Sequence, residues 1–273
     1  MVVGAESSVW KVTDGEGVLY IGGTIHLLTA EDYPLPVEFD QAYAASDHVV
    51  LETDITQLNQ PEFQVKLLSE LMYTGDSDLS SQINPQTEQA LTEFALSRNI
   101  PIEMLMRFKP GMLSMSLTIM EMQRLGLAGT GVDTHFSVLA TSDQKPLGQL
   151  ETVEQQISFI ANMGQDQVDK FVMYTLRQID QLPILLSSMK VAWRSGDMDT
   201  IDDIITAEMK SDFPEVYNKL IVHRNASWMP QIEAMLDSEE VEFVLVGAGH
   251  LTGDSGLLHQ LSEKGYGIDQ LNN

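Results

Sequence analysis

Two short hydrophobic runs, one near each end of the chain, stop at the same pattern, glycine-x-x-histidine. The first, GVLYIGGTIH, ends at His26, and the second, FVLVGAGH, ends at His250. Runs of this length and composition predict buried β-strands. A glycine before the strand's end lets the backbone turn sharply, and the histidine three residues later then projects beyond the strand. One copy of this pattern occurs by chance in many chains. Two copies, each after a buried strand, indicate two halves of one polar site.

The remaining hydrophobic and polar positions predict strands at the two ends and helices between them. A turn-forming segment, TDGEG, separates two strand-like runs and predicts a hairpin, and a helix-like segment leads into the β-branched run HVVLET. This order of strand, helix and strand is typical of the start of a parallel sheet. The pattern predicts strands at about residues 9–12, 18–22, 48–53, 145–150, 242–247 and 266–271.

The fold class expected from this order is α/β in one domain spanning residues 1–273. Strand-rich ends, about 9–55 and 240–271, build a central mixed or parallel sheet, and the segment of about 60–238 forms a large helical insertion. Neither a proline- and glycine-rich linker nor a low-complexity stretch divides the chain. Its length is above the usual size of one domain, but α/β folds often reach it as one unit.

A carboxylate follows the strand that lies between the two histidine patterns in the sequence. Glu52 and Asp54 end the run HVVLETD. Ligands of parallel sheets bind beyond the carboxyl ends of the strands, and two neutral imidazoles with one carboxylate are a common set for a divalent metal. Taken singly, such a histidine is usually hydrogen-bonded and structural, and such a glutamate usually caps a helix or joins a salt bridge. Together they predict a metal site of His26, Glu52 and His250, and Asp54 is the alternative to Glu52 as its carboxylate.

Charge and composition restrict the possible partners. The chain has 15 lysines and arginines against 40 aspartates and glutamates, a net charge of −25, which repels nucleic acid and anionic lipid. No apolar stretch approaches the ~20 residues of a membrane-spanning helix, so we expect no transmembrane segment and a soluble protein. The absence of cysteine excludes disulfides and thiolate ligands. The compartment stays open, because a periplasmic or secreted protein that has lost its signal peptide has the same features, and the oligomeric state is not fixed.

Two polar residues before a late helix add chemistry to the site. An arginine such as Arg224 offsets charge on an oxyanion, and an asparagine such as Asn225 holds a substrate carbonyl. Asn225 is equally suited to capping the helix that follows it. Asp133 is expected to be a helix N-cap or an outer-shell partner of an imidazole. His135 is expected to be structural or exposed.

The order of motifs resembles the TraB/PrgY/GumN family, which includes the Tiki Wnt-processing metalloproteases. The similarity rests on YIGGTIHLL, VVLETD, GTGVDTHF, VHRNASWMPQI and VLVGAGHLTGDSGLLHQLSEKGYGI and covers nearly the whole chain. It implies a Tiki-like and erythromycin-esterase-like α/β fold of two related halves, each giving one motif histidine. His26 and His250 match these histidines, Glu52 matches the family's acidic residue, and Arg224 with Asn225 match its polar pair.

The resemblance implies a divalent-metal-dependent hydrolase, and we expect a peptidase that cleaves a peptide or protein with a metal-activated water. It favours Mn²⁺ or Co²⁺, while Zn²⁺ or Fe²⁺ also suits histidine and carboxylate ligands. A binding protein that sequesters a peptide signal or a haem-like ligand in the same cleft without turnover is the alternative. In both cases the strands before His26 and His250 are expected to lie side by side or nearly so.

Overall fold

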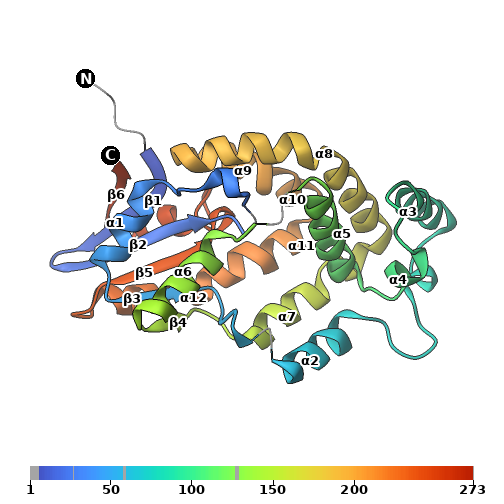
Figure 1. Cartoon of the computed structure of the whole chain (residues 1–273), viewed down its shortest axis with the longest axis horizontal. Coiled ribbons are helices and arrows are strands. Elements are labelled where there is room, and N and C mark those ends of the chain that lie inside the picture. Colours follow the sequence, from blue (N-terminus) through green and yellow to red (C-terminus); the bar gives the residue numbers. More distant parts are fainter. Residues whose placement is uncertain (1–5, 27, 58–59, 127–128, 273) are drawn as a thin grey trace. The chain divides into compact units, whose positions relative to one another are not determined.

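The computed structural model describes residues 6–26, 28–57, 60–126 and 129–272. The chain divides into two compact units. The first combines residues 1–55, 127–152 and 185–273, and the second combines residues 56–126 and 153–184. The described strands all belong to the first unit, which confirms a mixed α/β class (Figure 1). The arrangement in two related halves stays a prediction.

The first unit contains a six-stranded mixed sheet with the order β4-β3-β5-β2-β1-β6. The expected hairpin is present, because β1 and β2 pair antiparallel, and β6 pairs antiparallel with β1. The strands are β1 (Glu6–Asp14), β2 (Gly17–Thr24), β3 (His48–Leu51), β4 (Leu147–Gln149), β5 (Glu242–Gly247) and β6 (Gly267–Asn272).

The four strands β2, β5, β3 and β4 run parallel to one another. The register pairs Thr24 of β2 with Gly247 of β5, and Leu51 of β3 with Leu245 of β5. The strands that precede the two motif histidines are therefore direct neighbours, which confirms that prediction. The two strands of the predicted strand–helix–strand unit, β2 and β3, are not adjacent in the sheet. Strand β5, which comes much later in the sequence, lies between them.

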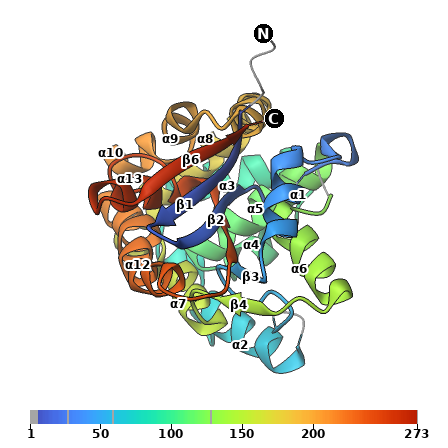
Figure 2. The ribbon, with the colours of Figure 1, turned by 90° about the vertical axis from the view of Figure 1, so that its left-hand side faces the viewer.

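Helices of the first unit cover both faces of this sheet. Along β5, Phe243 and Leu245 belong to one hydrophobic cluster, and Val244 and Val246 belong to the other, as the twofold alternation of a strand requires. Figure 2 shows α1 and α6 on one side of the sheet and α12 and α13 on the other. The helices of this unit are α1 (Val37–Ala45), α6 (Val132–Asp143), α9 (Met198–Ile205), α10 (Ala207–Asp212), α11 (Pro214–Tyr217), α12 (His223–Leu236) and α13 (Leu257–Glu263).

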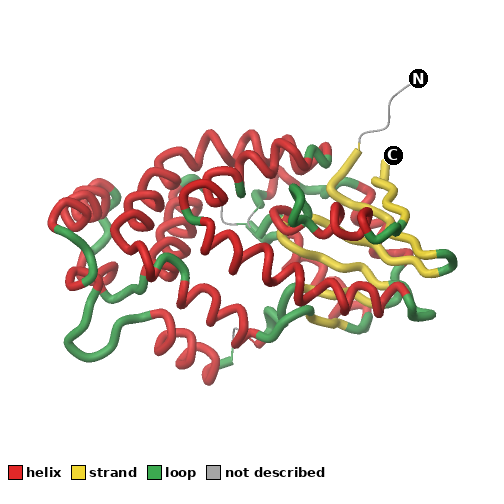
Figure 3. Tube along the Cα trace, turned by 180° about the vertical axis from the view of Figure 1, so that it is seen from behind, coloured by secondary structure: helices red, strands yellow, loops and turns green. Residues whose placement is uncertain are grey.

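The second unit is built from helices and the loops that join them (Figure 3). Its hydrophobic side chains form two clusters, one around Leu91, Leu113 and Val172 and a smaller one around Leu71 and Ile157. Helix α8 (Val168–Ser195) begins in this unit and ends in the first. The other helices are α2 (Pro61–Leu71), α3 (Pro85–Ser97), α4 (Ile102–Met106), α5 (Pro110–Arg124) and α7 (Val153–Asn162).

Candidate active site at the sheet edge

Each of the four parallel strands is followed by a polar residue of one cluster. His26 comes two residues after β2, and Glu52 directly follows β3. Glu151 comes two residues after β4, and His250 lies in a 3-10 turn, Ala248–His250, that follows β5. The carboxyl ends of parallel strands meet at one edge of the sheet, so residues distant in the sequence converge there.

Arg224 of α12 is the centre of the cluster. Its Nε and Nη2 atoms donate to the two carboxylate oxygens of Glu151, at 3.0 and 2.7 Å. Nη2 also donates to Oε2 of Glu52 at 2.6 Å, and Nη1 lies 2.8 Å from Nε2 of His250. The guanidinium carbon is 4.6 Å from the centre of the Trp228 ring. Arg224 is only 4% exposed. A buried guanidinium therefore joins two carboxylates and one imidazole.

The tautomer of His250 follows from its contacts with Asn225. The Asn225 amide nitrogen donates to the backbone carbonyls of His250 and Ser255, at 3.0 and 2.8 Å, so its oxygen faces Nδ1 of His250 at 2.7 Å. Nδ1 must then carry the proton, and Nε2 accepts from Arg224. Burial and the positive charge of Arg224 lower the pKa of His250 to about 3, despite the opposing charge of Glu52. His250 is thus a neutral imidazole held from both nitrogens.

These contacts change the interpretation of Asn225. The residue lies inside α12 rather than before it, so the helix-capping alternative is wrong. The chain is already helical in the π-helical turn Asn218–Val222, which leads directly into α12. Such turns are frequent at functional sites. The Asn225 amide is used within the protein to orient His250, a different task from the substrate contact expected for it.

Glu52 and the histidines surround the backbone of Gly247. The N–H of Gly247 donates to Oε1 of Glu52 at 2.6 Å. A Cβ added at Gly247 would lie 3.2 Å from Glu52 Oε1, 3.7 Å from Nε2 of His26 and 3.8 Å from Cδ2 of His250. Burial favours the neutral acid, but the surrounding positive charge and the Gly247 N–H lower the pKa of Glu52 to about 2. The space over Gly247, meaning the position that this Cβ would occupy, is therefore bordered by three of the predicted site residues.

His26 is the most exposed member of the cluster and has its own carboxylate partner. Its side chain is 67% exposed, and its Nδ1 lies 3.3 Å from Oδ1 of Asp133 in α6. The hydrogen bond and the negative charge of Asp133 raise the pKa of His26 to about 9. Gly131 is the N-cap of α6. The N-cap alternative for Asp133 is therefore wrong, and its expected role as an imidazole partner is confirmed.

Glu151 was not predicted as a site residue. The three residues of β4 are exposed, so the strand before Glu151 lacks the hydrophobic run that identified the other strand ends. The available signal was the position of a glutamate directly after a short predicted strand, as at Glu52. Burial raises the pKa of Glu151, although its pair with Arg224 opposes this shift.

The cluster has features that suit a cation. Glu52 and Glu151 pair with Arg224, and Asp133 pairs with His26. Three carboxylates therefore meet two cations, the guanidinium and the protonated His26 ring, which leaves one negative charge in excess. Among the residues that the structure describes, the Thr24 hydroxyl is buried with no hydrogen-bond partner, and Thr24 pairs with Gly247 across the sheet. The space over Gly247, the charge excess and this hydroxyl are compatible with a bound ion.

Other features limit how a metal would be held. Within the described ranges, no group of three histidine, aspartate or glutamate side chains is arranged as metal ligands. The Nε2 atom of His250 and Oε2 of Glu52 are both occupied by Arg224. Nε2 of His26 and Oε1 of Glu52 are the atoms that border the space over Gly247.

The sequence profile of the TraB/PrgY/gumN family matches residues 8–270 of this chain, nearly its full length. The chain belongs to this family. The resemblance drawn from the motifs is thereby confirmed. The family includes proteins similar to this chain in two bacteria. The uncharacterized protein YbaP of Escherichia coli strain K12 is 23% identical over 257 residues, which cover 92% of each chain. The uncharacterized protein YbaP of Shigella flexneri is 24% identical over 240 residues, or 88% of this chain and 86% of the relative.

No solved structure matches this chain significantly. The family match includes every residue of the cluster, from His26 to His250. The chemistry of the cluster depends on its own residues and their geometry. In the described part of the chain, no helix is both long and apolar enough to cross a membrane.

Proposed function

We propose that the protein is a hydrolase that cleaves peptide or protein amide bonds in a divalent-metal-dependent reaction at the space over Gly247. The observation that carries the proposal is the convergence of His26, Glu52 and His250 on this space, beside the buried charge of Arg224. An excess of carboxylates, neutral imidazole and a guanidinium at the carboxyl edge of a parallel sheet is an arrangement suited to polarising a carbonyl.

His26 and Glu52 would hold the ion, and His250 would join them if Arg224 released its Nε2 atom. A bound Mn²⁺ or Co²⁺, or equally Zn²⁺ or Fe²⁺, would supply Lewis acidity and lower the pKa of water. The chain's own residues have separate tasks. Arg224 places positive charge beside the reacting carbonyl, Asn225 fixes the His250 ring, and Glu151 holds the Arg224 fork in position.

His26 is suited to handling a proton in this reaction. Its Nδ1 contacts Asp133, which leaves Nε2 directed to the same space as Glu52 Oε1. A carboxylate behind an imidazole fixes its tautomer and raises its basicity. The protonated ring, favoured by Asp133, is an acid that can donate to the leaving amine. Metal ligation and proton transfer are competing uses of Nε2, and substitutions distinguish them.

A peptide library incubated with and without Mn²⁺, Co²⁺ or Zn²⁺, followed by mass spectrometry, tests the proposal. We expect metal-dependent cleavage by the wild-type protein, its loss in His26→Ala and Glu52→Gln, and its retention in His259→Ala. His259 is a suitable control because it is an exposed histidine on α13. Equilibrium dialysis of each variant measures metal binding separately. Capture of peptides without cleavage at any metal concentration would refute hydrolysis and support the binding-protein alternative.

A further inference from the structure

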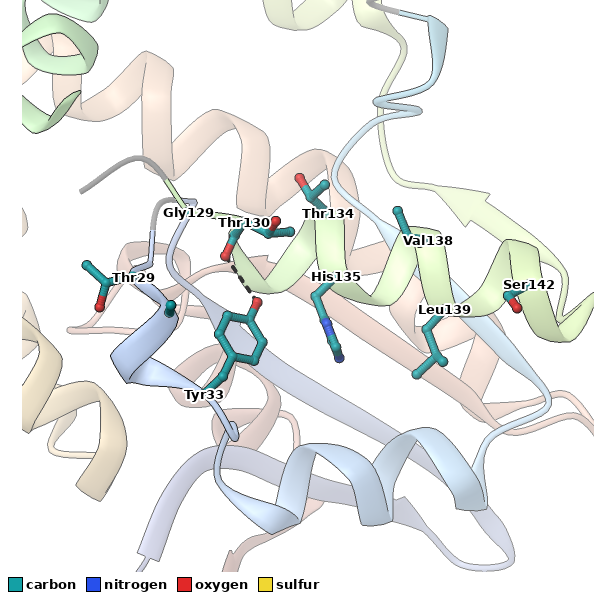
Figure 4. A pocket seen from close by; sticks show the side chains of 10 residues that line it. Thr29, Tyr33, Gly129, Thr130, Thr134, His135, Val138, Leu139 and Ser142 are labelled. Carbon is teal, nitrogen blue, oxygen red and sulfur yellow. Dashed lines mark hydrogen bonds between the residues drawn. The ribbon is translucent and has the colours of Figure 1, made fainter. Parts of the chain in front are cut away.

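A pocket lies beside the segment that carries His26, and none of the predicted site residues lines it. Its volume is about 610 Å³, within the range of small-molecule and peptide side-chain sites. Figure 4 shows Tyr33 next to His135, with Leu139 projecting from the same side of α6. The lining residues are Thr29, Ala30, Tyr33, Gly129, Thr130, Thr134, His135, Val138, Leu139 and Ser142.

The walls of the pocket are extensions of the two segments that hold His26 in place. The loop after His26 supplies Thr29 and Tyr33, and α6, which places Asp133 against His26, supplies Thr134 and His135. Val132 N–H donates to the carbonyl of Ile25 at 3.1 Å, and a Cβ at Gly131 would collide with the carbonyl of His26. The pocket therefore begins within one helical turn of Asp133, next to the candidate site.

The chemistry of the lining selects an uncharged ligand. Although the protein has a net charge of −25, no aspartate, glutamate, lysine or arginine lines the pocket. Its apolar wall includes Val138, whose side chain is 65% exposed although it is hydrophobic. The rings of Tyr33 and His135 lie 5.4 Å apart between their centres. An aliphatic or aromatic group placed here would bury apolar surface without displacing a charge.

The same wall offers hydrogen bonds to a peptide backbone. Hydroxyls of Thr134 and Ser142 border the cavity, and within the described residues no hydrogen bond is made to either ring nitrogen of His135. The Tyr33 hydroxyl donates to the carbonyl of Thr130 at 3.0 Å, which joins the two segments that line this side of the pocket. Apolar walls with a few polar groups are typical of sites that hold one side chain and the amides beside it.

We propose that this pocket binds an uncharged, apolar or aromatic side chain of a peptide substrate, near the bond presented to His26. The description of the ligand as a substrate rests on the proposed function, but binding to the pocket is tested without any cleavage. Acidic side chains are disfavoured there, because the pocket lacks a cation and lies beside Asp133 in a strongly acidic protein.

The experiment titrates metal-free protein with two blocked peptides, acetyl-Gly-Phe-Gly-amide and acetyl-Gly-Glu-Gly-amide. The histidine rings are isotope-labelled, and the His135 signal is assigned with His135→Gln. We expect the phenylalanine peptide to shift this signal and the glutamate peptide to bind far more weakly. Val138→Asp should weaken binding of the phenylalanine peptide by about tenfold, since it removes the apolar wall and adds like charge to an uncharged site. Val138→Lys should improve binding of the glutamate peptide relative to Val138→Asp.

The matched control is Val191→Asp, an exposed valine on α8 in the same unit and outside the pocket lining. It should bind both peptides as the wild-type protein does. The proposal is overturned if the His135 signal does not respond, if Val138→Asp and Val191→Asp behave alike, or if the two peptides bind equally. Binding without cleavage would refute only hydrolysis. Cleavage with unchanged preference in Val138→Asp would refute only the pocket assignment.

Discussion

Replacing Arg224 by methionine tests the geometry of the cluster most directly. The guanidinium is 4% exposed and is joined to Glu52 and Glu151, which are 9% and 6% exposed. Methionine keeps much of the side chain's volume but leaves two buried carboxylates without their partner. Breaking a buried ion pair from one side costs about 3–5 kcal/mol. We expect the free energy of unfolding of Arg224→Met to fall by about that amount.

Urea unfolding at neutral pH, followed by far-ultraviolet circular dichroism, measures the loss. Tryptophan fluorescence is a poor single probe, because the Trp228 ring lies 4.6 Å from the guanidinium carbon and its native signal will change. Arg194→Met is the control, since Arg194 is exposed and donates to the backbone carbonyl of Asp32. We expect it to cost about 1 kcal/mol or less.

The double variant Arg224→Met with Glu151→Met separates pairing from packing. Removing Glu151 as well takes away one unpaired charge, so the double variant should lose less than the two single variants added together, by about 1 kcal/mol or more. A loss below about 1 kcal/mol in Arg224→Met, or strictly additive losses, would refute the bidentate pair as described.

Three further outcomes follow from the site. Asp133→Asn should move the titration midpoint of His26, measured by NMR, from about 9 toward 6.5. The stability that this pair contributes is present below pH 6.5 and is lost as pH rises through 9. An unchanged midpoint would contradict the pairing of His26 with Asp133. His250→Gln should reduce the dependence of the free energy of unfolding on pH below 6.5. Because the buried ring has a pKa of about 3, the wild-type protein should lose up to about 1.4 kcal/mol per pH unit as pH falls below 6.5. Equal pH dependence in the variant and the wild-type protein would count against a buried neutral His250. Gly247→Ala should leave the protein folded, since φ there is −51°, but reduce metal binding and turnover at least about tenfold by filling the space beside Glu52 Oε1; full activity would place the reaction elsewhere.

Strands β2, β3 and β5 were predictable because each is a buried hydrophobic run, and the two motif histidines follow two of these runs. Alternation and turn chemistry predicted β1, β2 and β5, and the duplicated motif predicted that β2 and β5 would be neighbours. The position of β5 between β2 and β3 was not predictable from local patterns, because strand order is decided by packing across the whole unit.

The errors have local physical causes. Helix capping was one of two alternatives for Asn225 because asparagine favours that position, but the preceding π-helical turn makes Asn225 an interior residue of the helix. Glu151 was missed because β4 is a short exposed edge strand without a hydrophobic run. The proton position on His250 depends on a chain of contacts through Asn225 that no sequence pattern encodes.

The pairing of β2 with β5 has a consequence for the time at which the site exists. Thr24 and Gly247 are neighbours in the sheet although more than two hundred residues separate them along the chain. During synthesis, the first histidine leaves the ribosome long before the strand that completes its surroundings, and such distant contacts form slowly. A growing chain therefore carries no assembled cluster of His26, Glu52 and His250 until β5 has emerged. If the protein cleaves peptides, that activity cannot begin before β5 has joined β2 in the folded sheet, so the ribosome-bound chain is inactive until then.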